Sequence, residues 1–308
     1  MVGGGVIPGM SDYPAFALHV TEPTPIPVLI TVPHAGRAYP ESLLARMRNP
    51  GMTCLRLEDR HVDRLGAEIV RQTGGALLVA HAPRAAIDLN RDVHDMDWEM
   101  VQGGAPSGEA HRPHGARASG GLGLVPRRLG GLGDIWKGRF DAADVHARIE
   151  GIHRPYHAAI SATLAMISAR WGGALLIDLH SMPPLAPGPT GRCTELVLGD
   201  RFGGSCSGSL IASAFDHLAR QDVLAAYNRP YAGGYVLDRH GAPMEGVHAI
   251  QIEVCRSLYL DASHREISDG LGPLATLLSG LVRVLADELI ARVPSAGKSG
   301  EGWGLAAE

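Results

Sequence analysis

Short apolar runs alternate along the chain with segments whose apolar residues have helical spacing. The runs predict strands at 27–32, 76–80, 175–179, 194–198 and 247–254. The helical spacing predicts helices at 59–73, 141–170 (with a break at Pro155), 207–221 and 267–293. Continuous apolar strands alternating with helices are typical of an α/β fold, here expected as three α/β/α layers around a mixed, mostly parallel central sheet.

The spacing of these elements predicts a single α/β domain over residues 25–293. Residues 1–24 are rich in Gly and Pro and are expected to form a flexible lead-in, and residues 294–308 a flexible tail. Residues 92–134 are rich in Gly, Pro, His and Arg with little periodicity. A segment of that length inside a compact domain is usually functional, so we expect a lid-like loop there.

Composition narrows the class of protein. The chain of 308 residues has a formal net charge of −4, which argues against nucleic acid or an anionic membrane surface as partner. Its four cysteines form no CxxC pair, so neither a zinc knuckle nor a disulfide scaffold is indicated, and a reduced, cytoplasmic location is expected. The start lacks the features of a secretory signal, and no apolar run approaches the roughly 20 residues of a membrane span.

Three apolar runs end on polar side chains: VLITVPHAG (Val28–Gly36), ALLIDLHSM (Ala174–Met182) and HAIQIEVCR (His248–Arg256). Ligands of open α/β sheets bind beyond the carboxyl ends of the strands, where His34 and His180 fall. Either histidine alone is more often a hydrogen-bonded structural residue than a metal ligand. Two together favour a catalytic zinc site, which uses three protein ligands and one open position.

Acidic residues supply candidates for the third ligand and for a general base. Glu58 and Asp59 open a predicted helix, where carboxylates also serve as caps. Glu253 lies on the polar side of an apolar strand, where burial would raise its pKa toward the range that suits a base. The alternative is that Glu253 pairs with Arg256.

Arginines follow several predicted strands, and guanidinium groups suit carboxylate substrates and oxyanions. Asn90 and Arg91, directly after the strand-like AAIDL, are the candidates for a carboxylate clamp, and Arg229 is a further substrate-binding candidate. Arg84 is the candidate for stabilising an oxyanion. A nucleotide site is not indicated, because no GK[ST] follows a Gly-rich loop, and the G-x-S-x-G signature of serine hydrolases is missing.

Eight blocks occur in order over residues 26–290: VPHAGRAYP, EDRHVDRL, PRAAIDLNRD, GLGLVPR, HRPYHAAI, DLHSMPP, NRPYAGGYVLDRHG and HAIQIEVCRSLYLD. In these blocks the chain resembles the N-formylglutamate amidohydrolase family, a relative of zinc carboxypeptidases and aspartoacylases. The resemblance implies an α/β/α fold and zinc-dependent hydrolysis of the N-acyl amide of an amino acid such as N-formyl-L-glutamate. It also implies a role in histidine degradation.

Carried over by position, the resemblance implies that His34 and His180 bind the metal. It also implies that Glu253 is the catalytic glutamate and that Asn90 and Arg91 hold a substrate carboxylate. One departure concerns the H-x-x-E motif of the carboxypeptidase relatives, because Arg37 stands three residues after His34. The acidic ligand must come from elsewhere, with Asp59 as first choice and Glu58 as second.

The working hypothesis is a zinc amidohydrolase acting on a small acyl-amino acid, with oligomeric state left open. Within the same chemistry, the alternative is a carboxypeptidase-like enzyme or another N-acyl-amino-acid deacylase. Two alternatives without catalysis are a metal-binding homologue and a structural protein that binds no metal. Cobalt and iron share such ligands with zinc, so another divalent metal is an alternative cofactor.

Overall fold

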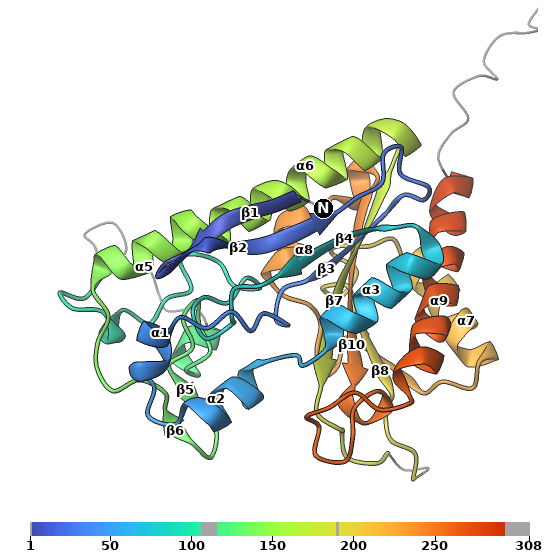
Figure 1. Ribbon diagram of the computed structural model, residues 1–308. Coiled ribbons are helices and arrows are strands. Elements are labelled where there is room, and N and C mark those ends of the chain that lie inside the picture. The colour runs from blue at the N-terminus through green and yellow to red at the C-terminus, as the bar shows by residue number, and fades with distance from the viewer. Residues whose placement is uncertain (1, 106–115, 189–190, 293–308) are drawn as a thin grey trace, which may run out of the picture.

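The computed structural model describes residues 2–105, 116–188 and 191–292, and its centre is one eight-stranded sheet (Figure 1). The strands of this sheet are β1 (Val2–Ile7), β2 (Met10–His19), β3 (Val28–Val32), β4 (Ala76–Ala80), β7 (Ala174–Met182), β8 (Leu196–Gly199), β9 (Ala225–Tyr227) and β10 (Val247–Cys255). Their spatial order is β1-β2-β4-β3-β7-β10-β8-β9. The central strands β4, β3, β7 and β10 are mutually parallel, and antiparallel pairs flank them, which confirms the predicted mixed α/β sheet.

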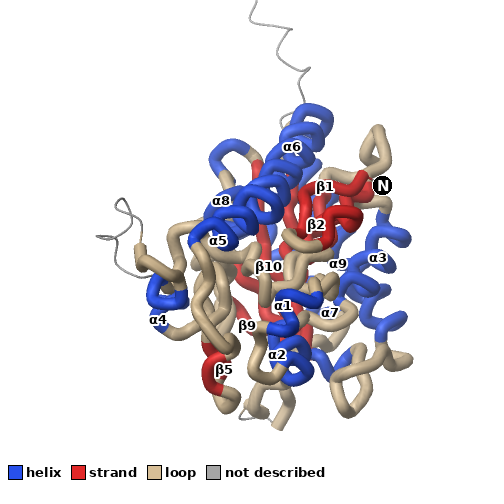
Figure 2. Tube along the Cα trace, turned by 60° about the vertical axis from the view of Figure 1, so that its left-hand side comes forward, coloured by secondary structure: helices blue, strands red, loops and turns tan. Residues whose placement is uncertain are grey.

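Helices cover both faces of the sheet, as expected for three layers. The helices are α1 (Glu41–Ala45), α2 (Pro50–Leu57), α3 (Val62–Thr73), α4 (Ala116–Ser119), α5 (Ala142–Arg148), α6 (Arg154–Trp171), α7 (Gly208–Arg220), α8 (Tyr235–His240) and α9 (Leu271–Arg292). Helix α6 runs along one face, while α3, α7 and α9 pack on the other. Figure 2 shows α6 passing in front of β1 and β2. A small hairpin, β5 (Arg128–Leu129) with β6 (Gly133–Asp134), stands apart from the main sheet.

The alternation of side chains along β7 and β10 places the polar residues of these strands on one face of the sheet. In β10, Ile250, Ile252 and Val254 share one face and pack against α3, α7 and α9. The opposite parity, which faces the side of α6, carries Gln251 and Glu253. The polar side chains of these strands therefore collect on one face of the sheet, toward its carboxyl edge.

The prediction that residues 1–24 form a flexible lead-in is wrong. Strands β1 and β2 form an antiparallel hairpin, and β2 pairs with β4 at the edge of the sheet. The glycines of this segment serve close packing rather than flexibility. A Cβ added at Gly4 would lie 2.5 Å from the Phe16 ring, and one at Gly5 would lie 2.6 Å from the Gly151 carbonyl oxygen. Composition alone cannot separate these two uses of glycine.

Other predicted elements are found with shifted bounds. The helix expected over 141–170 consists of α5, a π-helical turn at Ile149–His153 and α6, whose first turn contains Pro155. The strand-like AAIDL segment forms turns instead of a strand. The last helix begins at Leu271, later than predicted, and the expected tail at 294–308 lies outside the described residues.

None of the helices in the described ranges has both the length and the apolar character needed to cross a membrane.

Candidate active site

The register of three parallel strands assembles the floor of the candidate site. Thr31 on β3 is level with Asp178 on β7, which is level with Gln251 on β10. Two residues further along, His180 is level with Glu253. Because side chains at one register share a face, the carboxyl edge of the sheet presents a row of polar groups. His34 joins this row from the turn that follows β3.

The structure groups His34, Asp59 and His180 as a candidate metal centre. One ligand atom from each of these buried residues lies within 4.8 Å of the other two. The Asp59 Oδ2 atom is 3.1 Å from Nδ1 of His180 and 3.6 Å from Nδ1 of His34. Glu58 is not part of the group, because its carboxylate accepts hydrogen bonds from the Tyr39 hydroxyl and from Arg60.

A second carboxylate stands behind each histidine. The Nε2 atom of His34 is 2.7 Å from Asp88 Oδ1, and Nε2 of His180 is 2.7 Å from Asp178 Oδ2. A carboxylate accepts only, so each Nε2 carries a proton and donates it in the hydrogen bond to the carboxylate behind it. Each Nδ1 faces Asp59, and its lone pair is available to a cation once that nitrogen is deprotonated. Such carboxylate–histidine pairs orient metal ligands, so this donor set fits Zn²⁺.

Nearby carboxylates determine the pKa shifts within the group of His34, Asp59 and His180. Burial alone would lower the pKa of His180, but the carboxylates of Asp178 and Asp59 raise it well above its ordinary value. Burial would raise the pKa of Asp59, yet hydrogen bonds from His180 and His34 hold it well below its usual range. The negative charge is therefore retained in a buried place, where it attracts a cation.

Glu253 is buried next to this group, and its environment favours the protonated carboxyl. Burial raises the pKa of Glu253 to about 7; His180 opposes the shift and Asp59 adds to it. The side chain of Gln251 donates a 3.0 Å hydrogen bond to Glu253 Oε1. Arg256 pairs with Asp59 at 3.1 Å, so the alternative in which Arg256 neutralises Glu253 does not describe the structure.

A cavity of about 240 Å³ contains this group. His34, Asp59, His180 and Glu253 all line it. Five arginines also line it: Arg56, Arg84, Arg91, Arg117 and Arg256. Several guanidinium groups around one small cavity indicate a ligand with more than one negative charge.

The substrate-binding candidates are placed in different ways. Arg91 lines the cavity and also donates to the carbonyl oxygens of Leu122 and Asn90. Asn90 lines it too, but its Oδ1 accepts from the Val236 amide and its Nδ2 donates to Gln251, so its amide is largely engaged by the protein. Arg229 is exposed and is not among the lining residues, so the structure separates it from the group.

Arg84 also lines the cavity, and its Nε donates a 2.8 Å hydrogen bond to Asp88. Although burial would lower the pKa of Arg84, the charge of Asp88 and of the other nearby carboxylates raises it. The guanidinium is therefore a fixed positive charge at the site.

The sequence-based list lacks several contributors, among them Asp178, Asp88 and Gln251. Asp88 contacts His34 across 54 positions of the chain, and Gln251 lies one β-strand period before Glu253. The parity of Gln251 on its strand could have identified it. Nothing in PRAAIDLNRD marks Asp88, because its place depends on the turns at 83–91.

The described part of the predicted lid-like loop, 92–105 and 116–134, contributes Arg117 and Leu122 to the cavity wall. Leu124 and Val125 of the same segment are buried in the core. This part of the loop is therefore packed onto the domain. Any role of the loop as a lid stays a prediction.

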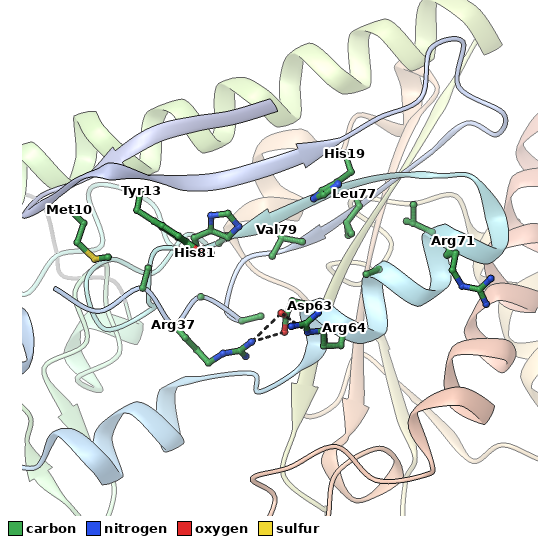
Figure 3. Close-up of a pocket in the computed structure, with 16 residues that line it drawn as sticks. Met10, Tyr13, His19, Arg37, Asp63, Arg64, Arg71, Leu77, Val79 and His81 are labelled. Carbon is green, nitrogen blue, oxygen red and sulfur yellow. Dashed lines mark hydrogen bonds and ion pairs between the residues drawn. The ribbon is translucent and has the colours of Figure 1, made fainter. Parts of the chain in front are cut away.

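A larger cavity of about 730 Å³ lies elsewhere, between β2, β4 and α3 (Figure 3). It shares none of the grouped residues, although Ala35–Ala38, directly after His34, form part of its wall. Among the polar residues of its wall, Arg37 and Asp63 form an ion pair, drawn as dashed lines in Figure 3. The larger of the two cavities is therefore not the one that contains the candidate metal ligands.

Comparisons with known proteins agree with this fold and identify the family. A family model described as N-formylglutamate amidohydrolase matches residues 26–260. The crystal structure of N-formylglutamate amidohydrolase from Ralstonia eutropha superposes with a TM-score of 0.80 at 30% identity, covering 89% of this chain and 98% of that one. N-formylglutamate deformylase of Pseudomonas aeruginosa is 28% identical over 240 residues, covering 77% of this chain and 83% of that protein. The deformylase of Pseudomonas putida is 27% identical over 283 residues, covering 84% and 92%.

Fold and site together define an α/β protein with a candidate cation site of two histidines and one aspartate at the carboxyl edge of its sheet. Within that class, the chain belongs to the N-formylglutamate amidohydrolase family.

Proposed function

We propose that this protein is a zinc-dependent amidohydrolase that converts N-formyl-L-glutamate to glutamate and formate. The curated relatives are named N-formylglutamate deformylase, which supports the substrate. The observation that carries the proposal is the grouping of His34, Asp59 and His180 beside Glu253 in an arginine-lined cavity.

The metal would be held by His34, Asp59 and His180. A Zn²⁺ ion bound there would polarise the formyl carbonyl and acidify a water molecule. Asp88 and Asp178 hold the Nε2 side of the two imidazoles. The Nδ1 atoms of both histidines are therefore directed at the position that the metal would occupy. Cobalt or iron would suit the same donors.

Glu253 is the general base of the proposed reaction. It takes a proton from the attacking water while the water oxygen bonds to the formyl carbon. It then delivers that proton to the amine nitrogen as the C–N bond breaks, which releases formate and glutamate. A pKa near 7 suits both steps, because a base and its conjugate acid are then both accessible at neutral pH.

The arginines bind and stabilise negative charge. N-formyl-L-glutamate carries two carboxylates, and guanidinium groups bind carboxylates through paired hydrogen bonds. Arg91 is our candidate for one carboxylate, with Arg56, Arg117 and Arg256 as the other cationic groups of the wall. Arg84, fixed by Asp88, is our candidate for stabilising charge on the carbonyl oxygen.

A second candidate function, deacylation of a longer acyl-amino acid or peptide, is favoured by an adjoining cavity. That cavity has a volume of about 510 Å³ and shares Asn90, Arg91, Arg117 and Gly233–Gly234 with the first. Its wall also carries Arg201, Arg239 and acidic groups, which suit a substrate with charges of both signs.

The decisive experiment measures formate released from N-formyl-L-glutamate by zinc-loaded protein, with Glu253→Gln as the matched variant. Release that disappears in Glu253→Gln supports substrate, reaction and base together. Release from N-acetyl amino acids or short peptides, and none from the formyl compound, supports the second candidate. Stoichiometric zinc without hydrolysis of any of these substrates would show a non-catalytic homologue.

We further propose that the protein acts in the cytoplasm, in histidine degradation. The four cysteines are free thiols in the structure, which suits a reducing compartment.

A further inference from the structure

A second group of buried histidines lies behind the candidate site. His153 ends the π-helical turn, His157 lies one turn later on α6, and His240 is the last residue of α8. The rings of His157 and His240 are stacked, with centroids 5.2 Å apart and planes at 15°. The rings of His153 and His157 have centroids 4.4 Å apart. None of these residues is part of the grouped metal ligands or the cavity wall.

The hydrogen bonds of this group fix where each proton lies. Nε2 of His157 is 3.0 Å from the Leu89 carbonyl oxygen, which only accepts, so His157 Nε2 donates. The Nδ1 atom of the neutral His157 ring then accepts, and His240 Nε2 donates to it at 2.9 Å. His240 Nδ1 accepts in turn from the Ser161 hydroxyl at 3.5 Å. The chain of donors therefore runs in one direction, from Ser161 through His240 and His157 to Leu89.

His153 makes a parallel contact one turn earlier. Its Nε2 donates at 2.9 Å to the carbonyl oxygen of Arg91. The two carbonyls that accept hydrogen bonds from these imidazoles, those of Leu89 and Arg91, thus flank Asn90. The same turn contains Asp88, which contacts His34.

The other end of the hydrogen-bond chain lies on α8, whose N-terminal end adjoins another part of the cavity wall. His240 closes α8, whose Val236 amide donates to Asn90 Oδ1 at 2.9 Å. Gly234, just before α8, lines the cavity and packs so closely on Asn90 that an added Cβ would lie 2.6 Å from its Oδ1. The imidazoles therefore join two cavity walls, the 88–91 turn and the start of α8, from behind.

We propose that His157, supported by His240 and His153, is a positioning residue that sets the 88–91 turn against α8 and thereby places Arg91 in the substrate cavity. The proposal rests on the proposed function, because it assigns the effect to substrate binding. It also gives a purpose to the histidines of the blocks HRPYHAAI and VLDRHG, which the proposed chemistry does not use.

The test compares His157→Phe with His157→Gln in zinc-loaded protein. Phe keeps a ring in the stack but loses both hydrogen bonds, whereas Gln keeps an amide donor for the Leu89 carbonyl. We expect His157→Phe to raise KM for N-formyl-L-glutamate by about tenfold or more, the size of a lost buried hydrogen bond. We expect kcat to change less, zinc stoichiometry to stay at the wild-type value, and His157→Gln to recover much of the loss.

The matched control is His146→Phe, because His146 is an exposed histidine on the preceding helix, α5. It should leave KM unchanged. If His157→Phe does not fold, His153→Gln and His240→Gln test the same contacts one at a time. Wild-type KM in folded His157→Phe, or a loss that is only in thermal stability, would overturn the proposal.

Failure of the proposed function would look different, since wild-type protein would then release no formate. The hydrogen-bond chain is tested in that case by ¹⁵N spectra of the histidine side chains. We expect His157 to be neutral, with its proton on Nε2. A protonated ring, or a proton on Nδ1, would overturn the proposal whatever the substrate.

Discussion

The two buried histidine groups of this protein have opposite surroundings. His34 and His180 are each backed by a carboxylate, whereas His153 and His157 are backed by main-chain carbonyls. The pKa of His180 is raised well above its ordinary value, chiefly by Asp178 against the effect of burial. Burial lowers the pKa of His157 to about 2 and that of His240 to about 4. The hydrogen-bond partner of a buried histidine therefore decides whether its ring is stabilised in the positively charged form or in the neutral form.

This difference separates two roles for one residue type. A carboxylate behind the ring adds negative charge and directs a lone pair toward a cation. A carbonyl behind the ring accepts a hydrogen bond from it, and the ring stays neutral and joins two segments of the polypeptide. The predictions below test this separation, beginning with the largest expected effect.

Removing a carboxylate-backed histidine should abolish metal binding and activity together. His180→Ala is expected to lose stoichiometric zinc and to lower kcat/KM for formate release by at least about 10³-fold, because the ligand set falls to two residues. Metal content by mass spectrometry and a formate assay measure both effects. His157→Phe is the comparison and should retain its zinc. Equal loss of zinc in the two variants would contradict the separation of roles.

Glu253→Gln should change the pH dependence of stability in the metal-free protein. The pKa of Glu253 is about 7 in the folded protein against 4.5 ordinarily, so its contribution to stability is present below pH 4.5 and is lost as pH rises to about 7. Gln does not ionise and escapes this loss. Relative to wild type, the variant should gain about 3 kcal/mol in free energy of unfolding between these pH values.

Denaturant unfolding of chelator-treated protein at several pH values measures that difference. A difference that stays constant with pH would mean that Glu253 has an ordinary pKa, and would weaken its assignment as the base.

Asp88→Asn should weaken metal binding without abolishing it. Loss of the carboxylate behind His34 is expected to lower zinc affinity about 10- to 100-fold, the usual effect of removing such a partner. Competition with a fluorescent chelator measures the affinity. Asp63→Asn is the matched control, since Asp63 pairs with Arg37 beside the larger cavity (Figure 3). An unchanged affinity in Asp88→Asn would show that the turn at 88–91 does not orient His34.

The sequence predicts those parts of the site that depend on local periodicity. The parity of β10 places Glu253 on the face opposite the core formed with α3, α7 and α9, and the ends of β3 and β7 place His34 and His180 at one edge. Asp88 could not be predicted this way, because it lies in turns and meets His34 only through tertiary packing. The edge hairpin was missed because its glycines are as typical of a loop as of close packing.

The sequence does indicate one feature of the carbonyl-backed histidines, which is that two of them share a helix face. His153 and His157 are four residues apart, so a helix places them on one face, and this spacing is visible in HRPYHAAI. The spacing cannot show which group accepts the hydrogen bonds of these histidines. Whether their face of the helix contacts a carboxylate or a carbonyl depends on the conformation of the 88–91 turn, which only the structure shows.

The smallest expected effect is a loss of stability in mild acid. The pKa of His157 is depressed from 6.5 to about 2, so its contribution is present above pH 6.5 and is lost as pH falls toward 2, the opposite sign to Glu253. By pH 5.5 the loss should be about 1 kcal/mol in free energy of unfolding. His157→Gln cannot be protonated and should lack this component, so the difference between the two proteins should shrink as pH falls from 7 to 5.5. A difference that grows instead would mean that His157 is protonated in the folded protein, and the neutral chain from Ser161 to Leu89 could not exist.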